Sequence, residues 1–530
     1  MELHPSAHLD TFCRDRLPPV EQWPEFLFDP PVPRYPDRLN CATVLLDETI
    51  AAHGGARPCL HAKGAPTWSY DELRATANRI AHVLVEDHGL VPGNRVLLRG
   101  PNTPWIAACW FAVLKAGGVV VATMPLLRRH ELEVIHDIAH VDLALVDHRF
   151  LEEMSGIAVP LQPFGGDDAG DLTRLAAAKP AEFEDLLTSA DDVALLAFTS
   201  GTTGRPKCAM HFHRDVLAMA DTFSAEVLQP QPDDVFTGTP PIAFTFGLGG
   251  DLVFPLRAGA SALMIEKATP PELAALIEEY GVTTLFTAPT AYKAMLATGA
   301  KLDSLRSAVS AGEHLPAATW EAFRQATGVR IIDGIGSTEM LHIFIASSGD
   351  DIRPGSTGRA VPGYVATILD DDGHEVPHGE PGHLAVKGPT GCRYLDDPRQ
   401  QQYVRHGWNL TGDTYRMDDD GYFWYLARSD DMIISSGYNI AAPEVEEAVL
   451  KHPDVAECAV VGWPDEQRGM IVKAYVVLTQ GVAPDPELVP KLQDFVKAEI
   501  APYKYPRAVE FVDELPRTQT GKLQRFRLRA

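Results

Sequence analysis

The chain of 530 residues is too long for one hydrophobic core, so we expect two or more domains. Its hydrophobic share of 45% and charged share of 22% are ordinary for a soluble globular protein. The net charge is −26, from 72 acidic and 46 basic side chains, and the sequence has no long Lys/Arg run. This charge argues against nucleic acid and anionic membranes as partners. An anionic small-molecule substrate must therefore be bound by a few individually placed cationic side chains.

The cysteines and the apolar segments indicate a cytoplasmic protein without a membrane anchor. Seven cysteines are scattered, odd in number and without a CxxC pair, which favours reduced thiols over a disulfide framework or structural zinc. The first residues lack the apolar core of a signal peptide, and no apolar run approaches the length that spans a bilayer.

The first two thirds of the chain alternate helical and strand patterns. Residues 1 to about 40, rich in proline and aromatic residues, are predicted to form an extended arm on the main body. The patterns that follow predict, in chain order, a helix over Leu73–Leu84, a strand over Arg95–Arg99, a helix over Trp105–Ala116, strands over Val119–Ala122 and Val193–Phe198, a helix over His211–Glu226, a strand over Ala262–Ile265, a helix over Pro271–Tyr280, a strand over Val282–Phe286, a helix over Ala291–Ala297 and a strand over Arg330–Ile332. This rhythm predicts a mostly parallel sheet covered by helices, arranged as two α/β halves.

The pattern changes after about residue 350. Short strands such as Val365–Leu369 and Gly382–Lys387 predict a small antiparallel, β-barrel-like region attached to the α/β body. Beyond Arg428 a compact α+β unit is predicted, with a helix from Pro443, strands over Cys458–Val461 and Val472–Leu478, a helix over Pro486–Ile500 and a strand over Ala508–Val512. We therefore expect an N-terminal domain, 1–429, and a smaller C-terminal domain, 430–530.

The segment from Phe198 to Lys207 predicts a phosphate-binding loop. Its composition of two glycines, four hydroxyls, an arginine and a lysine suits an anion, since glycines let backbone N–H groups approach phosphate oxygens and the lysine adds a charge. The contacting residues would be Thr199, Ser200, Gly201, Thr202, Thr203, Gly204 and Lys207. A solvated Ser/Thr/Gly-rich turn is the alternative, and a Walker loop is excluded because no Gly-Lys-Ser/Thr occurs.

The string Thr-Ser-Gly-Thr-Thr-Gly-Arg-Pro-Lys resembles the signature loop of the adenylate-forming superfamily, which contains acyl- and aryl-CoA synthetases, the adenylation domains of peptide synthetases, and luciferases. The resemblance extends over almost the whole chain. It implies a large N-terminal domain of two α/β subdomains and a β-barrel-like region, followed by an α+β domain that swings on a hinge. It also implies ATP, Mg²⁺ and coenzyme A as cofactors and substrates.

A second motif runs from Gly334 through Ile335, Gly336 and Ser337 to Thr338 and Glu339. A carboxylate beside a phosphate loop suits a divalent cation held between them, although a helix N-cap with acids in its first turn is the plain alternative. The resemblance implies that Thr338 contacts phosphate and that Glu339 holds Mg²⁺. Many family members have an aromatic residue at position 335 that stacks on adenine, whereas here the surface is aliphatic.

Further residues are assigned to the nucleotide by the resemblance. Asp413 can accept hydrogen bonds from two ribose hydroxyls. Tyr425 and Arg428 follow as nucleotide-binding residues, with ribose and phosphate contacts placed on the arginine, although an Asp/Arg-rich turn would explain either motif alone. The backbone of Ala311, Gly312 and Glu313 is expected to line the adenine edge, and Asp333 to accept from the adenine amino group.

The C-terminal domain is expected to supply Lys522 and the hinge. Lys522, alone an exposed lysine on a tight turn, resembles the catalytic lysine that bridges carboxylate and phosphate, where a cation lowers repulsion between two anions. Asp430 matches the hinge position, and Ser436, Gly437 and Arg468 are assigned to coenzyme A. A charged linker and ordinary surface cations are the alternatives.

The acid pocket is predicted from two aromatic segments. Phe244, Thr245, Phe246 and Gly247 form one, and His342 and Ile343 follow the second motif. Aromatic walls with one polar group suit a benzoate-sized ligand, although a satisfied structural histidine would explain His342 alone. The run Gly-Ser-Thr-Glu-Met-Leu-His-Ile-Phe resembles the benzoate and 2-aminobenzoate (anthranilate) CoA ligase branch.

The sequence therefore predicts an AMP-forming acid-thiol ligase that activates a small aromatic acid as acyl-AMP and transfers it to coenzyme A. The alternatives are adenylation of an aliphatic or bulky acid, loading of a separate carrier protein, and a nucleotide sensor without catalysis. The acid, the thiol acceptor and the oligomeric state, for which a homodimer is one option, stay open.

Overall fold

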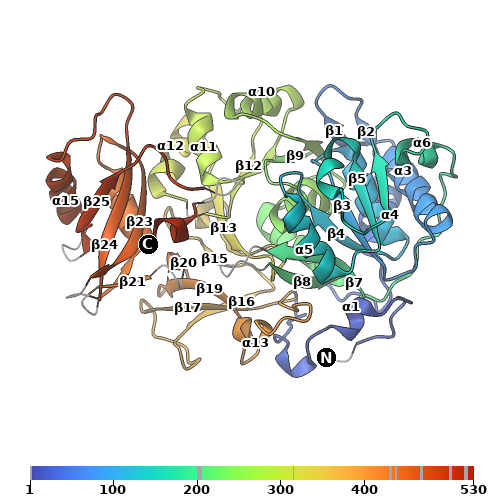
Figure 1. Ribbon diagram of the computed structural model, residues 1–530, viewed down its shortest axis with the longest axis horizontal. Coiled ribbons are helices and arrows are strands. Elements are labelled where there is room, and N and C mark those ends of the chain that lie inside the picture. The colour runs from blue at the N-terminus through green and yellow to red at the C-terminus, as the bar shows by residue number, and fades with distance from the viewer. Residues whose placement is uncertain are drawn as a thin grey trace.

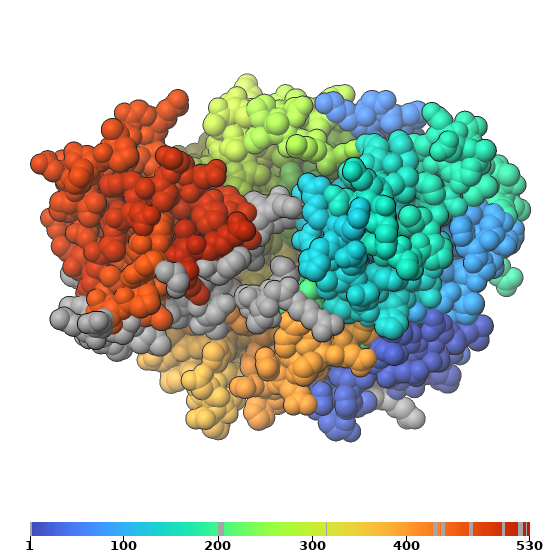
Figure 2. All heavy atoms as spheres, in the orientation of Figure 1, coloured from blue at the N-terminus to red at the C-terminus, as the bar shows by residue number. Residues whose placement is uncertain are grey.

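The structure is a computed structural model, and it describes residues 3–199, 206–313, 315–428, 432–435, 438–465, 469–500, 504–517 and 523–529. Two α/β sheets and a curled antiparallel sheet form the large body, and a smaller α+β unit lies at one end of the long axis (Figure 1). In the space-filling view this unit, coloured red, forms a separate lobe beside the body (Figure 2). The predicted fold class is confirmed.

The first sheet has six strands in the order β6-β5-β3-β4-β7-β8. All neighbours are parallel except β7 and β8, which form an antiparallel hairpin. The strands are β3 (Arg95–Arg99), β4 (Val119–Thr123), β5 (Leu143–Asp147), β6 (Leu161–Phe164), β7 (Val193–Thr199) and β8 (Lys207–Phe212), with helices α3 (Tyr70–His82), α4 (Pro104–Lys115), α5 (Arg129–Ala139) and α6 (Leu172–Ala177).

Helices α3 and α4 show why these segments are helical. A capping box joins Ser69 and Glu72 at the start of α3, and Thr103 with Pro104 begins α4, so backbone N–H groups at both N-termini have acceptors. Helix α4 is apolar around almost its whole circumference and largely buried, and most of its residues belong to the largest hydrophobic cluster.

The second sheet has nine strands in the order β15-β14-β13-β12-β11-β9-β10-β1-β2. The run from β13 to β1 is parallel, and its edges are closed by antiparallel strands. The strands are β1 (Pro58–Ala62), β2 (Trp68–Ser69), β9 (Val235–Gly238), β10 (Ser261–Met264), β11 (Thr284–Thr287), β12 (Ser307–Ser310), β13 (Ile331–Gly336), β14 (Ile343–Ala346) and β15 (Arg359–Ala360).

The helices that accompany this sheet include three π-helical segments. In chain order they are η2 (Thr43–Glu48), α2 (Thr49–His53), α7 (His213–Met219), η6 (Ala220–Leu228), α8 (Thr245–Leu248), η7 (Gly249–Val253), α9 (Phe254–Arg257), α10 (Pro270–Tyr280), α11 (Pro289–Leu296) and α12 (Ala317–Thr327). Segments α7 and η6 correspond to the predicted helix 211–226, which begins two residues later than expected because His211 still belongs to β8.

The third sheet, orange in Figure 1, is antiparallel and lies below the two α/β sheets in that view. It consists of β16 (Val365–Leu369), β17 (Pro381–Lys387), β18 (Val404–Arg405), β19 (Trp408–Met417) and β20 (Phe423–Arg428), with the short helix α13 (Gln400–Tyr403). This is the predicted β-barrel-like region.

The C-terminal unit has its own sheet and its own hydrophobic cluster. Its elements are β21 (Met432–Ser435), β22 (Tyr438–Ala441), α14 (Ala442–Leu450), β23 (Val455–Asp465), β24 (Gly469–Leu478), α15 (Leu488–Glu499) and β25 (Ala508–Phe511). The N-terminal arm, with α1 (Phe12–Asp15), lies on the body through backbone N–H groups of His4 and Ala7 that donate to Asp191 and Asp192 at 3.0 and 2.9 Å. None of the helices in the described ranges has the length and apolar composition needed to cross a membrane.

Candidate functional site

Lys207 is the first residue of β8 and lies opposite Thr199 of β7 in the hairpin register. The predicted phosphate loop is therefore the connection of this hairpin. Its residues Ser200, Gly201, Thr202, Thr203 and Gly204 lie outside the described residues. On a strand, residues 207, 209 and 211 share one face, so β8 presents Lys207 and His211 in the same direction.

Lys207, Glu339 and Tyr394 form one hydrogen-bonded cluster. Lys207 Nζ lies 3.2 Å from Glu339 Oε1 and donates to Tyr394 Oη at 2.8 Å, while the Tyr394 hydroxyl donates to the same carboxylate oxygen. The side chain of Glu339 is 7% exposed and that of Lys207 is 21% exposed. Burial, followed by the charge of Glu339, raises the pKa of the Tyr394 phenol, so its hydroxyl keeps the proton it donates.

The turn that carries Thr338 and Glu339 is held from several sides. His211 Nε2 lies 2.8 Å from the Thr338 carbonyl oxygen, so Nε2 bears the hydrogen and donates it. The Thr390 hydroxyl donates to Met340 O at 2.8 Å. The backbone N–H of Met340 donates to Ser337 Oγ, which lies 3.2 Å from Tyr403 Oη. The turn is thus positioned by groups distant in the sequence.

Asp413 approaches the same region from β19. It is buried, and its backbone N–H donates to Thr411 Oγ1 at 3.2 Å. Burial, followed by the charge of Glu339, raises the pKa of the Tyr403 phenol, and the charge of Asp413 adds to this rise. Glu339 and Asp413, which the sequence assigned to a cation and a ribose, therefore both act electrostatically on the Tyr403 phenol.

The carboxyl ends of β12 and β13 place the remaining nucleotide candidates side by side. Ser310 and Asp333 are register partners, so Ala311, Gly312 and Glu313 follow β12 next to the Asp333–Ser337 segment. Burial raises the pKa of Asp333 to about 8, and its Oδ1 has no hydrogen-bond partner among the described residues. A buried carboxyl oxygen that lacks a partner is available to a ligand.

The glycines of the second motif allow close packing with β14. A Cβ atom on Gly334 would lie 2.8 Å from Ile343 Cδ1, and one on Gly336 would lie 2.6 Å from the carbonyl oxygen of His342. Ile335, between them, is partly buried and packs against the main hydrophobic cluster. The motif therefore fixes His342 and Ile343 relative to Glu339.

His342 lies at the centre of a group of phenylalanine rings. Its ring centroid is 4.5 Å from that of Phe254, 5.3 Å from Phe223, 5.7 Å from Phe246 and 6.2 Å from Phe286. Burial lowers the pKa of His342 to about 3, so the ring is neutral at physiological pH. Of the other acid-pocket candidates, Ile343 is buried, Phe244 is the N-cap of α8, and Thr245 and Gly247 lie within that helix.

The remaining predicted residues are placed by the structure only in part. Tyr425 packs on Tyr415 with ring centroids 5.4 Å apart, and Arg428 is the register partner of Asp413, but the Arg428 side chain lies outside the described part of the chain. Lys522, Asp430, Ser436, Gly437 and Arg468 also lie outside the described residues.

Oxygen donors suited to Mg²⁺ surround this site. Glu339 supplies a carboxylate whose contacts with Lys207 and Tyr394 both involve Oε1, and Ser337 and Thr338 supply hydroxyls on the same turn. Mg²⁺ takes carboxylate, hydroxyl, water and phosphate oxygens, so these residues fit the ion.

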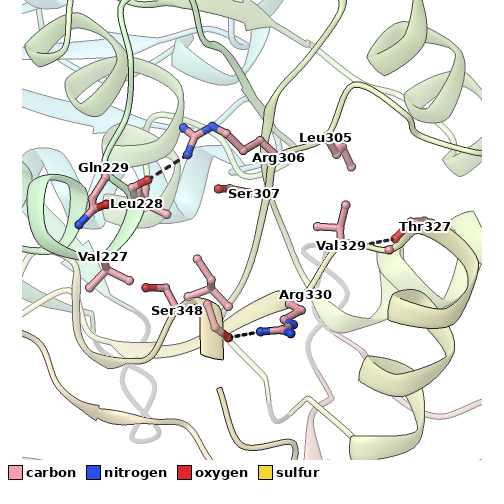
Figure 3. Close-up of a pocket in the computed structure, with 13 residues that line it drawn as sticks. Val227, Leu228, Gln229, Leu305, Arg306, Ser307, Thr327, Val329, Arg330 and Ser348 are labelled. Carbon is pink, nitrogen blue, oxygen red and sulfur yellow. Dashed lines mark hydrogen bonds between the residues drawn. The ribbon is translucent and has the colours of Figure 1, made fainter. Parts of the chain in front are cut away.

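A cavity of about 580 Å³ lies elsewhere, at the amino ends of β12 and β13 (Figure 3). Arg306 and Arg330 line it, and both are engaged, in ion pairs with Asp234 and Asp350. The nucleotide candidates lie at the carboxyl ends of the same strands, which is where open α/β sheets bind ligands. The cavity is therefore separate from the candidate site.

Sequence reasoning missed four residues of the site: His211, Thr390, Tyr394 and Tyr403. Tyr394 and Tyr403 lie in a segment without clear periodicity, so no local pattern distinguished them. His211 was included in a predicted helix, whereas its alternation with Lys207 along a strand would have indicated a shared direction.

Comparisons with known proteins identify the family of this chain and its relatives. Residues 46–393 match the AMP-binding enzyme family, and residues 444–522 match the AMP-binding enzyme C-terminal domain. A benzoate–CoA ligase from Thauera aromatica is 36% identical over 94% of this chain and 98% of its own length. A 3-hydroxybenzoate–CoA ligase from Aromatoleum sp. (strain CIB) is 32% identical over 93% and 96%. The crystal structure of the anthranilate CoA ligase AuaEII in complex with anthranoyl-AMP superimposes with a TM-score of 0.88 at 34% identity, covering 93% of this chain and 97% of that one.

Proposed function

This chain belongs to the adenylate-forming family of AMP-binding enzymes, and on that premise we propose that it is an ATP-dependent aryl-CoA ligase for a small aromatic acid of the benzoate or 2-aminobenzoate type. In the first step a carboxylate oxygen attacks the α-phosphorus of ATP, and the bond to the bridging oxygen of pyrophosphate breaks. In the second, the thiolate of coenzyme A attacks the acyl carbon and AMP leaves.

The observation that carries this proposal is the hydrogen-bonded cluster of Lys207 and Glu339. Asp413 acts on the same region through its charge, because Glu339 and Asp413 both raise the pKa of the Tyr403 phenol. We assign Lys207 and Thr338 to the phosphates and Asp413 to the ribose, because a cation, a hydroxyl and a carboxylate match the groups of one nucleotide. Asp333, whose Oδ1 has no partner in the described part of the chain, is assigned to the adenine amino group.

Glu339 would hold Mg²⁺, which neutralises charge on the phosphates when bound. This chain's own residues orient the substrates: Lys207 binds the phosphates, and the His211 and Thr390 hydrogen bonds keep the Thr338–Glu339 turn in place. The acid carboxylate and the α-phosphate are both anions and repel each other as they approach, so a further cation is needed between them. The resemblance assigns this role to Lys522.

The C-terminal unit is proposed to serve both steps. We place the domain boundary between residues 429 and 430, with Asp430 as the hinge, so that one orientation presents Lys522 and the other presents Ser436 and Gly437 to coenzyme A. The separate hydrophobic cluster of this unit supports the boundary, because a unit with its own core can move as a body. Seven buried free thiols fit a reducing compartment such as the cytoplasm.

We assign the aromatic acid to the surroundings of His342. The rings of Phe246, Phe254 and Phe286 around it would pack on an aryl group, and Phe244 and Thr245 stand at the start of the adjacent helix α8. Relatives named for benzoate, 3-hydroxybenzoate and anthranilate support an aromatic substrate over an aliphatic one.

A pyrophosphate-release assay over a panel of acids tests the proposal. We expect turnover with benzoate or 2-aminobenzoate, in the presence of ATP, Mg²⁺ and coenzyme A, to exceed turnover with aliphatic acids. Activity confined to long-chain acids, or turnover that depends on an added carrier protein in place of coenzyme A, would contradict it.

A further inference from the structure

Tyr394 is the one residue of the described cluster that contacts both charged groups and that the proposed function leaves without a role. It is 1% exposed, it accepts a hydrogen bond from Lys207 Nζ at 2.8 Å, and it donates one to Glu339 Oε1. A phenol hydroxyl has one hydrogen, so these two contacts use its donor and an acceptor site. Lys207 and Glu339 also compensate each other's charge directly, because Nζ lies 3.2 Å from Oε1.

The position of Tyr394 is fixed by the strand that carries Lys207. Residues 393–395 lie antiparallel to β8, with Tyr394 paired to Ala209, two residues along the strand from Lys207. The segment is held there by hydrogen bonds from Met210 N to Arg393 O at 2.8 Å, from Leu395 N to Cys208 O at 2.9 Å and from Tyr394 N to Gln400 Oε1 at 2.8 Å. The hydroxyl therefore has little freedom to follow Lys207 if that side chain moves.

Nucleotide binding would separate the two charges. If Lys207 turns to a phosphate oxygen, Glu339 is left as a buried carboxylate without its counterion, which is costly unless a cation takes the place of the ammonium group. The Tyr394 hydroxyl still donates to Oε1, so the carboxylate stays oriented with Oε2 available.

We propose that Tyr394 is a positioning residue that couples cation binding to nucleotide binding, by holding Glu339 in place when Lys207 is transferred to the phosphates. This inference rests on the proposed function, because it assumes that Lys207 and Glu339 serve ATP and a divalent cation. It adds a residue, Tyr394, and a thermodynamic linkage between two ligands.

The test measures ATP affinity by calorimetry in excess Mg²⁺ and in EDTA, for the unsubstituted chain and for Tyr394→Phe. The ratio of the two dissociation constants is the coupling between ion and nucleotide. We expect this ratio to fall about tenfold in Tyr394→Phe, since a hydrogen bond to a charged group is removed. In a Glu339→Gln background, Tyr394→Phe should leave the ratio unchanged, because the carboxylate that the Tyr394 hydroxyl orients is absent.

Tyr70→Phe is the matched control. Tyr70 is also 1% exposed, and its hydroxyl donates to the Ala260 carbonyl, away from the cluster. We expect it to keep the coupling ratio of the unsubstituted chain.

The outcomes separate the two proposals. A Tyr394→Phe chain with unchanged coupling, or one that fails to fold while Tyr70→Phe folds, overturns the inference and leaves the proposed function standing. Absence of ATP binding in the unsubstituted chain overturns both.

Discussion

Asp333 lies within β13, and one of its carboxyl oxygens is buried and has no hydrogen-bond partner in the described ranges. Burial raises its pKa to about 8, whereas an unfolded aspartate titrates near 3.8. Between these values the folded chain retains a proton that the unfolded chain releases, so rising pH favours unfolding across this window.

We therefore predict that Asp333→Asn flattens the pH dependence of stability. The unfolding temperature of the unsubstituted chain should fall as the pH rises from 5 to 8, and that of the variant should fall less. The difference in unfolding temperature in favour of the variant should therefore be largest at pH 8. The unfolding midpoint at the two pH values is the measurement, since a chain of several domains has no single unfolding free energy.

Asp167→Asn, at an exposed position, is the control, and we expect it to leave the pH dependence of the unfolding temperature unchanged. If the unfolding temperature of Asp333→Asn falls between pH 5 and 8 as much as that of the unsubstituted chain, the Asp333 carboxyl group is not held neutral by burial.

At the scale of elements, the π-helical segment η7 packs against the side chains assigned to the acid pocket. Its first residue, Gly249, packs directly on His342: a Cβ atom there would lie 2.4 Å from His342 Cδ2 and 2.8 Å from Phe254 Cζ. The two rings are buried, so they cannot move away without disturbing their neighbours.

Gly249→Ala is predicted to impair the acid more than the nucleotide. Overpacking of this kind costs about 1–3 kcal/mol, so we expect the KM for the aryl acid to rise about tenfold while the KM for ATP stays within about twofold. Steady-state kinetics with each substrate varied in turn measure the two constants.

Gly170→Ala provides the comparison, because a Cβ atom at that position would meet no atom within 4 Å. Equal rises in both KM values for Gly249→Ala would show that the substitution disturbs the body of the enzyme and not the acid pocket.

At the element scale, the strongest local patterns were predictable. Strands β3 and β16 have the bounds that alternation and apolar runs indicated, and the helix with Pro443 in its first turn is α14. Lys207 was expected at the end of a loop and instead begins β8, because pairing with β7 extends the strand. The strand propensity of residues 207–212 alone cannot show this pairing, because the partner strand β7 lies on the other side of the hairpin connection.

The site itself was predictable only in part. Lys207, Glu339 and Asp413 belong to ordered motifs, which a resemblance can locate. Tyr394 is 187 residues from Lys207 and 55 from Glu339, so the contact among them is a property of the folded chain.

At the scale of the whole molecule, the account rests on two units that act on one nucleotide in turn. The body collects Lys207 from the first sheet, Glu339 from the turn between β13 and β14, and Asp413 from the third sheet. The C-terminal unit has a core of its own, which is the physical condition for movement as a body.

The measurement that tests this most directly compares the two half-reactions of Lys522→Ala. Acid-dependent exchange of pyrophosphate into ATP reports adenylation, and formation of the CoA thioester from supplied aryl-AMP reports transfer. We predict that the variant loses exchange by at least about 10²-fold, since a cation between two anions is removed, and retains transfer. Equal loss of both half-reactions, or exchange that does not depend on an aromatic acid in the unsubstituted chain, would contradict the account.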